Sequence, residues 1–139
     1  MTILEAEVVD VVGIDPIRKA ASLNMLFPEQ FEFLEKFGIE PTCFDPSAVS
    51  FSYRKEDSIS GLSIEISFSG VEESFQVRLF RGGDDVAIIS SERVRSISVF
   101  EDDSGKGVRV AFDFQGLASE APIILEPVVN MRWWILRAN

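Results

Sequence analysis

The sequence predicts an α+β fold that is mostly β: one antiparallel meander of about 6–8 strands, with one or two helices near the N-terminus packed on one face. Apolar residues recur at every second position in several short segments between about Val49 and Phe114, and turn residues separate these segments. The clearest segment, Leu62–Ser69, alternates four large apolar side chains with four polar ones, which buries one face and solvates the other. The pattern is compatible with an open sheet and with a partly open barrel.

Length and composition indicate a single domain, residues 1–139, with a core of its own. Hydrophobic residues make up 46% of the 139 positions, and twelve residues are Phe, so a core can form without disulfides or metal ions. The chain has 23 acidic and 13 basic residues and a formal net charge of −10. Because this charge repels phosphate backbones and anionic lipids, we expect no binding to nucleic acid or to a membrane.

Cysteine usage and the first residues indicate a cytoplasmic protein. The single cysteine, Cys43, has no partner for an internal disulfide, which fits a reducing compartment. Cys43 lies between Thr42 and Phe44, where we expect a buried and unreactive thiol. Residues 1–13 lack the basic start and apolar run of a secretion signal, and no window reaches the length of a membrane helix.

The N-terminal part is expected to contain an edge strand and a short helix. Ile3–Val12 is rich in valine, which is typical of a strand. Asp15 can cap a helix that begins at Pro16, because proline is tolerated in the first turn. The helix is expected to extend to about Leu26.

A second helix is expected over Pro28–Gly38. Phe31, Leu34 and either Phe27 or Phe37 recur at spacings of three and four, which predicts the face that packs on the sheet. Gly38 supplies the left-handed conformation that commonly ends a helix.

Short strands follow a connection over Ile39–Ser47, which we exclude from the sheet because its two prolines cannot donate to a ladder. Gly82-Gly83-Asp84, Asp103-Ser104-Gly105 and Gly116 supply the turns between strands. The expected strands are Ala48–Arg54, Leu62–Ser69, Phe75–Arg81, Val86–Ser90, Arg95–Glu101, Val108–Phe114, Ile123–Glu126 and Val129–Arg137.

The absence of histidine is the most informative chemical observation. It excludes Ser-His and Cys-His pairs, the commonest general base near neutral pH, and most zinc sites. Paired carboxylates of the glycosidase type are the remaining catalytic option, but Glu65, Asp113 and Glu126 each lie on the polar phase of their strand, which predicts solvated side chains. We therefore predict no enzyme activity, no catalytic residue, no metal site and no cofactor.

Acidic residues gather in three expected turns. In a meander, alternate connections emerge at the same end of the sheet, so the turns near Lys55–Ser60, Arg81–Asp85 and Glu101–Lys106 are expected to lie together. Such crowding stores repulsion that a basic protein partner relieves, whereas the simpler interpretation is solvated hairpin ends. Glu101–Gly105 lacks the ligand spacing of a calcium loop. The predicted partner-binding acids are Glu56, Asp57, Asp84, Asp85, Glu101, Asp102 and Asp103.

Two adjacent tryptophans, Trp133 and Trp134, lie in an expected strand and should face opposite ways. One ring should be buried and the other should lie on the sheet surface. We include Trp134 among the partner-binding residues as an aromatic anchor. The alternative is a ring covered by a helix or by the N-terminal segment.

The segment Phe37–Val49 resembles the entry to a group of bacterial toxin-immunity proteins. In that group a Phe-Gly pair and a Pro precede an aromatic residue or His, then an Asp and a strand; here these positions are Phe37-Gly38, Pro41 and Phe44-Asp45. This sequence departs from the pattern by lacking His and by carrying Pro46 directly after Asp45. The resemblance covers about a tenth of the chain and implies tight protein binding without catalysis, with Asp45 as the site residue.

The sequence thus favours a non-enzymatic binding protein, an immunity protein that neutralises a basic, nuclease-type toxin through an acidic surface. Two alternatives remain open. A small barrel whose mouth holds one apolar molecule would be a ligand-binding domain. Unpaired edges at Val8–Val12 and Met131–Leu136 would suit a self-associating β domain.

Overall fold

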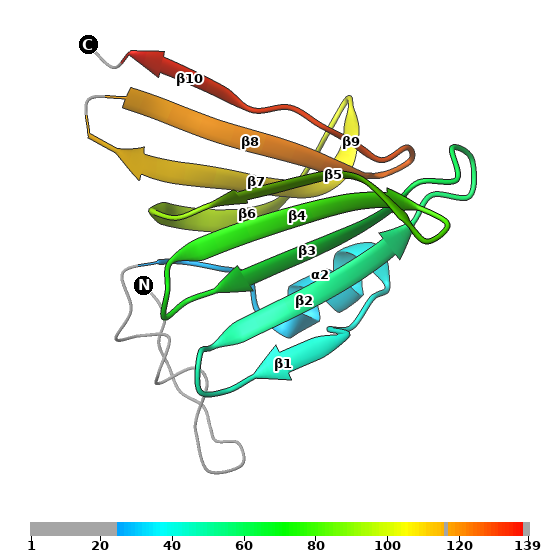
Figure 1. Ribbon diagram of the computed structural model, residues 1–139, viewed down its shortest axis with the longest axis horizontal. Helices are drawn as coiled ribbons and strands as arrows, with labels where there is room; N and C mark the ends of the chain where they lie inside the picture. Colours follow the sequence, from blue (N-terminus) through cyan, green and yellow to red (C-terminus); the bar gives the residue numbers. More distant parts are fainter. Residues whose placement is uncertain (1–24, 116, 138–139) are drawn as a thin grey trace.

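The computed structural model describes residues 25–115 and 117–137, which form two antiparallel sheets and one helix, α2 (Gln30–Phe37) (Figure 1). The first sheet has the order β1-β2-β3-β4-β5; the second has the order β10-β8-β7-β6, and β9 pairs with β8. The first sheet contains β1 (Cys43–Asp45), β2 (Ser50–Glu56), β3 (Ser63–Ser69), β4 (Ser74–Arg81) and β5 (Asp84–Ser91). The second contains β6 (Val94–Asp102), β7 (Gly105–Phe114), β8 (Leu117–Glu126), β9 (Asn130–Met131) and β10 (Trp134–Arg137).

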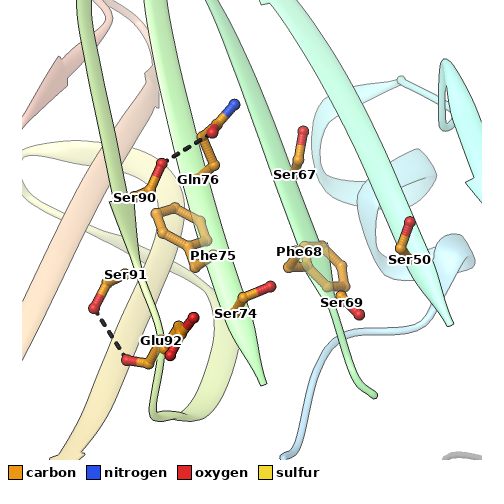
Figure 2. A pocket seen from close by; sticks show the side chains of 10 residues that line it. All are labelled: Ser50, Ser67, Phe68, Ser69, Ser74, Phe75, Gln76, Ser90, Ser91 and Glu92. Atoms are coloured by element: carbon orange, nitrogen blue, oxygen red, sulfur yellow. Dashed lines mark hydrogen bonds between the residues drawn. The ribbon is translucent and has the colours of Figure 1, made fainter. Parts of the chain in front are cut away.

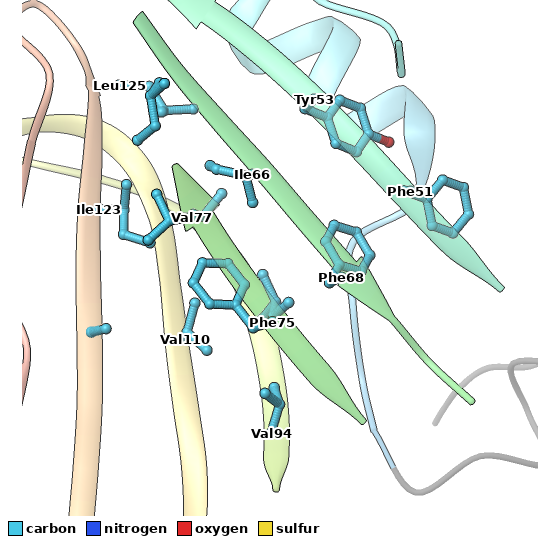
Figure 3. Close-up of a cluster of buried hydrophobic side chains, with 14 of the residues drawn as sticks. Phe51, Tyr53, Ile66, Phe68, Phe75, Val77, Val94, Val110, Ile123 and Leu125 are labelled. Atoms are coloured by element: carbon cyan, nitrogen blue, oxygen red, sulfur yellow. The ribbon is translucent and has the colours of Figure 1, made fainter. Parts of the chain in front are cut away.

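The core fills the space between the two sheets. Figure 3 shows Ile66 and Val77 of the first sheet pointing toward Val110, Ile123 and Leu125 of the second. Inward apolar residues alternate with polar ones along the strands, as the period-two pattern predicts. Each sheet therefore buries one face and leaves its outer face in contact with solvent.

The expected helix over 28–38 is confirmed, and its ends follow from its sequence. The Glu29 N–H donates to the Glu32 carboxylate at 2.9 Å, which satisfies one of the free donors at the start of α2. Gly38 has φ 70°, and its N–H donates to the carbonyl of Leu34 at 2.8 Å, which ends the helix.

The predicted packing face of α2 is wrong for two of its residues. Phe31 and Leu34 are 60% and 48% exposed, whereas Phe33 is fully buried and Phe37 nearly so. Phe33 stacks on Tyr53 of β2 with ring centroids 3.7 Å apart. Phe31 and Leu34 are spaced to share one helix face, and so are Phe33 and Phe37. The second pair is buried because Phe33 stacks on the aromatic residues of the sheet.

The single meander and the partly open barrel are also wrong, because the described residues form two open sheets. Each sheet is built from hairpins, but β5 pairs with β4 and not with β6. Between them, Arg93 has φ 66° and directs the chain into the second sheet. Alternation identifies inward residues without identifying the sheet to which a strand belongs.

The six strands expected between Ala48 and Phe114 are confirmed, with shifted ends. The next expected strand begins earlier, at Leu117, and the last is divided into β9 and β10. The expected connection at Ile39–Ser47 contains β1, because its prolines flank the strand rather than interrupt it. Cys43 lies in β1 and is exposed, so the expectation of a buried thiol is wrong.

The N-terminal expectations lie largely outside the described residues. Ile3–Val12 and residues 15–24 of the expected first helix belong to that part of the chain. Leu26 is not helical and lies parallel to β6, where its N–H donates to Arg95 O at 3.0 Å and its carbonyl accepts from Ile97 N–H at 2.9 Å. Within the described residues, no helix has the length and apolar character needed to span a membrane.

Candidate functional site

The three acidic connections do lie together, at the end of the molecule we call the acidic end: connection 57–62, turn 82–83 and turn 103–104 (Figure 1). Arg81 Nη2 donates to the carbonyl of Ser60 at 3.4 Å, which joins the first two. Glu126 bridges the two sheets, with Lys55 of β2 at 2.8 Å and Lys106 of β7 at 3.3 Å. The three connections thus lie at one end of the fold, and two sheets contribute them instead of one.

Asp57 has a different environment from the other acids of this end, because its side chain is only 5% exposed. Its carboxylate accepts from the N–H groups of Ile59 and Ser60, from the Ser60 hydroxyl at 2.8 Å and from the Val129 N–H at 3.0 Å. These hydrogen bonds, that from Val129 foremost, lower the pKa of the Asp57 carboxyl. Asp57 therefore ties connection 57–62 to the second sheet.

Ion pairs offset part of the charge of the acidic end. Asp85 binds Arg78 at 2.8 Å, Glu101 binds Lys36 at 3.1 Å, and Asp102 lies 3.9 Å from Arg109. Sequence reasoning missed these cations because Lys36 comes from α2, 65 positions away from Glu101, and because the other two pairs depend on the strand register. Within the described residues, three exposed acids of this end form no ion pair: Glu56, Asp84 and Asp103.

Two further carboxylates at this end are held ionised by their neighbours. The Ser104 hydroxyl donates to Asp102 at 2.6 Å and is the main cause that lowers the pKa of that carboxyl. Lys55, followed by Lys106, lowers the pKa of Glu126. These two carboxylates therefore stay ionised to a lower pH than they would without these neighbours.

Trp134 lies on the outer face of the second sheet and is 40% exposed. It pairs across strands with Glu120, which binds Arg109 at 3.2 Å; Arg109 in turn lies near Asp102 and over the Phe100 ring at 4.2 Å. Trp134 and Asp102 are thus connected across one face, although they lie on different strands.

The neighbouring ring of Trp133 is half-buried. It stacks on Phe112 with centroids 4.9 Å apart, and its Nε1–H donates to the Ser119 hydroxyl at 2.9 Å. The indole donor is therefore satisfied inside the fold. Of the two tryptophans, the exposed ring that can meet a partner is Trp134.

The other candidate residues do not form a catalytic or metal site. Glu65 binds Arg78 at 3.1 Å, Glu126 binds two lysines, and Asp113 is exposed. Asp45 accepts from the Ser47 N–H at 3.0 Å, as a turn residue does. Among the described residues, no group of three or more His, Cys, Asp or Glu side chains is placed to hold a metal ion.

A hollow of about 570 Å³ on the first sheet was not predicted, and we call it the serine hollow (Figure 2). Strand register explains it: Ser50, Ser69 and Ser74 are cross-strand neighbours, and Ser67, Gln76 and Ser90 form the next row. Short side chains on adjacent strands leave a depression. The lining residues are Ser50, Ser67, Phe68, Ser69, Ser74, Phe75, Gln76, Ser90, Ser91 and Glu92.

The serine hollow offers hydrogen-bonding groups but no cation. The Ser90 hydroxyl donates to Gln76 Oε1 at 2.9 Å. This hydrogen bond does not use the two N–H donors of the Gln76 amide. The hydroxyls of Ser52 and Ser67 lie 3.0 Å apart. Alternating serines are visible in the sequence, but the hollow also requires the strand register, which the sequence does not show.

Comparison with known proteins gives a likeness in fold. No protein-family model matches the chain, and no curated protein matches it. The chain is similar to a chain of the contact-dependent growth inhibition toxin–immunity protein complex from Klebsiella pneumoniae 342, with 24% sequence identity and a TM-score of 0.75. The match covers 82% of this chain and 99% of the other. This chain therefore shares its fold with a chain of a toxin–immunity protein complex.

Proposed function

We propose that this chain is an immunity protein, a non-enzymatic binding protein that neutralises a nuclease-type toxin by docking on its basic surface. The observation that carries the proposal is the fold, shared with a chain of a toxin–immunity complex over almost all of that chain. The residues of Phe37–Val49 support the same function independently, because they resemble the entry to immunity proteins. The proposed place of action is the cytoplasm, where a delivered nuclease meets its substrate.

The composition favours the interpretation that this chain corresponds to the immunity protein of such a complex and not to the toxin. A nuclease needs a cationic surface to hold a phosphate backbone, whereas this chain has a net charge of −10. The chain also lacks histidine, the commonest general base near neutral pH. An acidic inhibitor complements the surface that such a toxin must present, and long-range attraction speeds their encounter.

The proposed docking surface is the acidic end, with Trp134 as an aromatic anchor on the adjoining face. Asp102 connects the two, since it directly precedes turn 103–104 and lies beside Arg109 on the face of Trp134. The contribution of Asp57 is indirect, because its carboxylate holds the connection that directly follows Glu56. The proposed contact residues are Glu56, Asp84, Asp85, Glu101, Asp102, Asp103 and Trp134.

The open sheets and the filled core support a protein partner over a small apolar ligand. The space between the sheets is occupied by side chains such as Val108 and Ile123, both 0% exposed. A ligand-binding interpretation would require a lined cavity in that space.

The direct test is protection of growing cells. The chain is expressed beside an inducible toxin domain encoded by the adjacent open reading frame, and survival is expected only when the chain is present. Growth arrest despite soluble chain would contradict the proposal. Growth arrest by the chain alone would identify it as a toxin.

A charge-matched pair of variants tests the docking surface. Glu56→Gln/Asp84→Asn/Asp103→Asn removes three exposed charges at the acidic end, and we expect slower association with the toxin. Glu35→Gln/Glu40→Gln/Glu72→Gln removes three exposed charges elsewhere and is the control. Trp134→Ala should raise the dissociation rate if the ring is an anchor. Equal association rates for the two triple variants would rule out the acidic end.

A further inference from the structure

The strand β5 is the longest open edge in the described part of the chain. β1 has three residues and β10 has four, and Leu26 occupies part of the β6 edge through its hydrogen bonds with Arg95 and Ile97. β5 has eight residues and pairs only with β4 among the described strands. Its backbone therefore presents a row of donors and acceptors to any strand that approaches it.

The side chains of β5 do little to protect this edge. Val86 and Ile88 are 56% and 52% exposed, and residues 84–91 contain no Lys, Arg or Pro. Edge strands of soluble proteins usually carry such residues to prevent pairing with another chain. The register shifts at Val86, since Phe80 pairs with Asp85 and Leu79 with Ala87, so the regular edge is Ala87–Ser91.

The open edge is continuous with the serine hollow. Ser90, Ser91 and Glu92, at the end of β5, line the hollow together with residues of β3 and β4 (Figure 2). A strand added to β5 can therefore place a side chain over the hollow. The available groups there are hydroxyls, the Gln76 amide and the Glu92 carboxylate.

The charges at the two ends of β5 favour one kind of strand as its pairing partner. Asp84 precedes the regular edge and Glu92 follows it, and neither forms an ion pair among the described residues, whereas Asp85 is paired with Arg78. The neighbouring Arg93 donates to the carbonyl of Asp113. Two copies of this chain, each with a net charge of −10, would bring like charges together on pairing. A segment with Lys or Arg at its ends meets opposite charge at both ends of β5.

We propose that β5 and the serine hollow receive an extended segment of the toxin, which adds a strand to the first sheet and places a Lys or Arg side chain beside Glu92. This inference rests on the proposed function, since it names where the basic partner lies. Main-chain hydrogen bonds supply the pairing, and the hollow with its carboxylate selects the cationic side chain.

The edge is tested by Ile88→Lys, with Leu117→Lys as a control of equal charge change. Leu117 is 41% exposed and begins β8 in the other sheet. We expect the Kd for the toxin to rise by about tenfold or more for Ile88→Lys, and clearly less for Leu117→Lys. Thermal unfolding of both variants verifies that they fold.

The hollow is tested by Gln76→Trp, which fills it from an exposed position, with Gln30→Trp at an exposed position of α2 as the control. Only Gln76→Trp is expected to weaken toxin binding. Amide hydrogen exchange on the wild-type complex should show slower exchange over Ala87–Ser91.

The outcomes separate this inference from the proposed function. Wild-type affinity in both Ile88→Lys and Gln76→Trp would overturn the inference and leave the immunity function standing. Absence of any toxin binding by the wild type would overturn both. Light scattering that reports a dimer of the free chain, lost in Ile88→Lys, would assign the edge to a second copy and overturn the inference.

Discussion

At the scale of single residues, Asp57 holds the acidic end together. Its sequence context, between Glu56 and Ser58, is that of a solvated turn, and only the approach of Val129 from a distant connection buries it. That the three turns share one end could be expected from the strand order, but the structural role of Asp57 could not. Contacts between residues 72 positions apart leave no local signal.

Asp57→Asn should lower the stability at neutral pH, because an amide cannot accept all four hydrogen bonds as a carboxylate does. The pKa of Asp57 is lowered from 3.8, so its contribution to stability is present above that pH and is lost as the pH falls through the folded-state value. Urea unfolding at several pH values measures this. The exposed Asp103→Asn is the control, and an equal loss in both would contradict the assignment.

Gly107 is a residue whose role also depends on a distant strand. A Cβ at this position would collide with the carbonyl of Ile123, where the register of β7 and β8 shifts. Gly107→Ala should lower the free energy of unfolding by about 1–3 kcal/mol or more. At Gly83 an added Cβ meets open space, so Gly83→Ala should change it by less than about 0.5 kcal/mol. Similar effects of the two substitutions would disprove the explanation.

At the scale of elements, periodicity located strands and the second helix but could not choose between packing partners. The capping residues of α2 are local in sequence, so its position was predictable. Its buried face was not, because Phe31 and Phe33 are both large and apolar and the ring that decides, Tyr53, belongs to another element. The same limit explains why the strands of two sheets were predicted as one meander.

Phe33→Ala should lower the free energy of unfolding by about 3–5 kcal/mol, since it removes a fully buried ring that stacks on Tyr53. Phe31→Ala removes the same ring from an exposed position of the same helix and should change stability by less than about 1 kcal/mol. Chemical denaturation of the two variants decides which face packs. A larger loss for Phe31→Ala would contradict the structure.

At the scale of the whole molecule, the net charge follows from the composition alone. Which acidic side chains are paired with cations can be seen only in the folded structure. Cations from α2, β4 and β7 neutralise part of the acidic end, and none of them is adjacent in sequence to the acid it binds. The long-range field of the molecule still follows from the net charge of −10.

The association rate with the toxin should therefore fall by about tenfold or more when the salt concentration rises from about 0.01 M to about 1 M. The dissociation rate should change much less, because salt screens approach more than short-range contact. Stopped-flow mixing over this range measures both rates. A constant association rate would leave no role for the molecular charge in docking.

The exposed thiol of Cys43 makes these measurements practical without further substitution. Since the chain has one cysteine, a fluorophore or a nitroxide attached there labels a single known site on β1, at the opposite edge of the first sheet from β5. The same sulfur can also link two copies when no reductant is present. A covalent pair joined through β1 would mimic association, so a reducing buffer is part of every assay of oligomeric state.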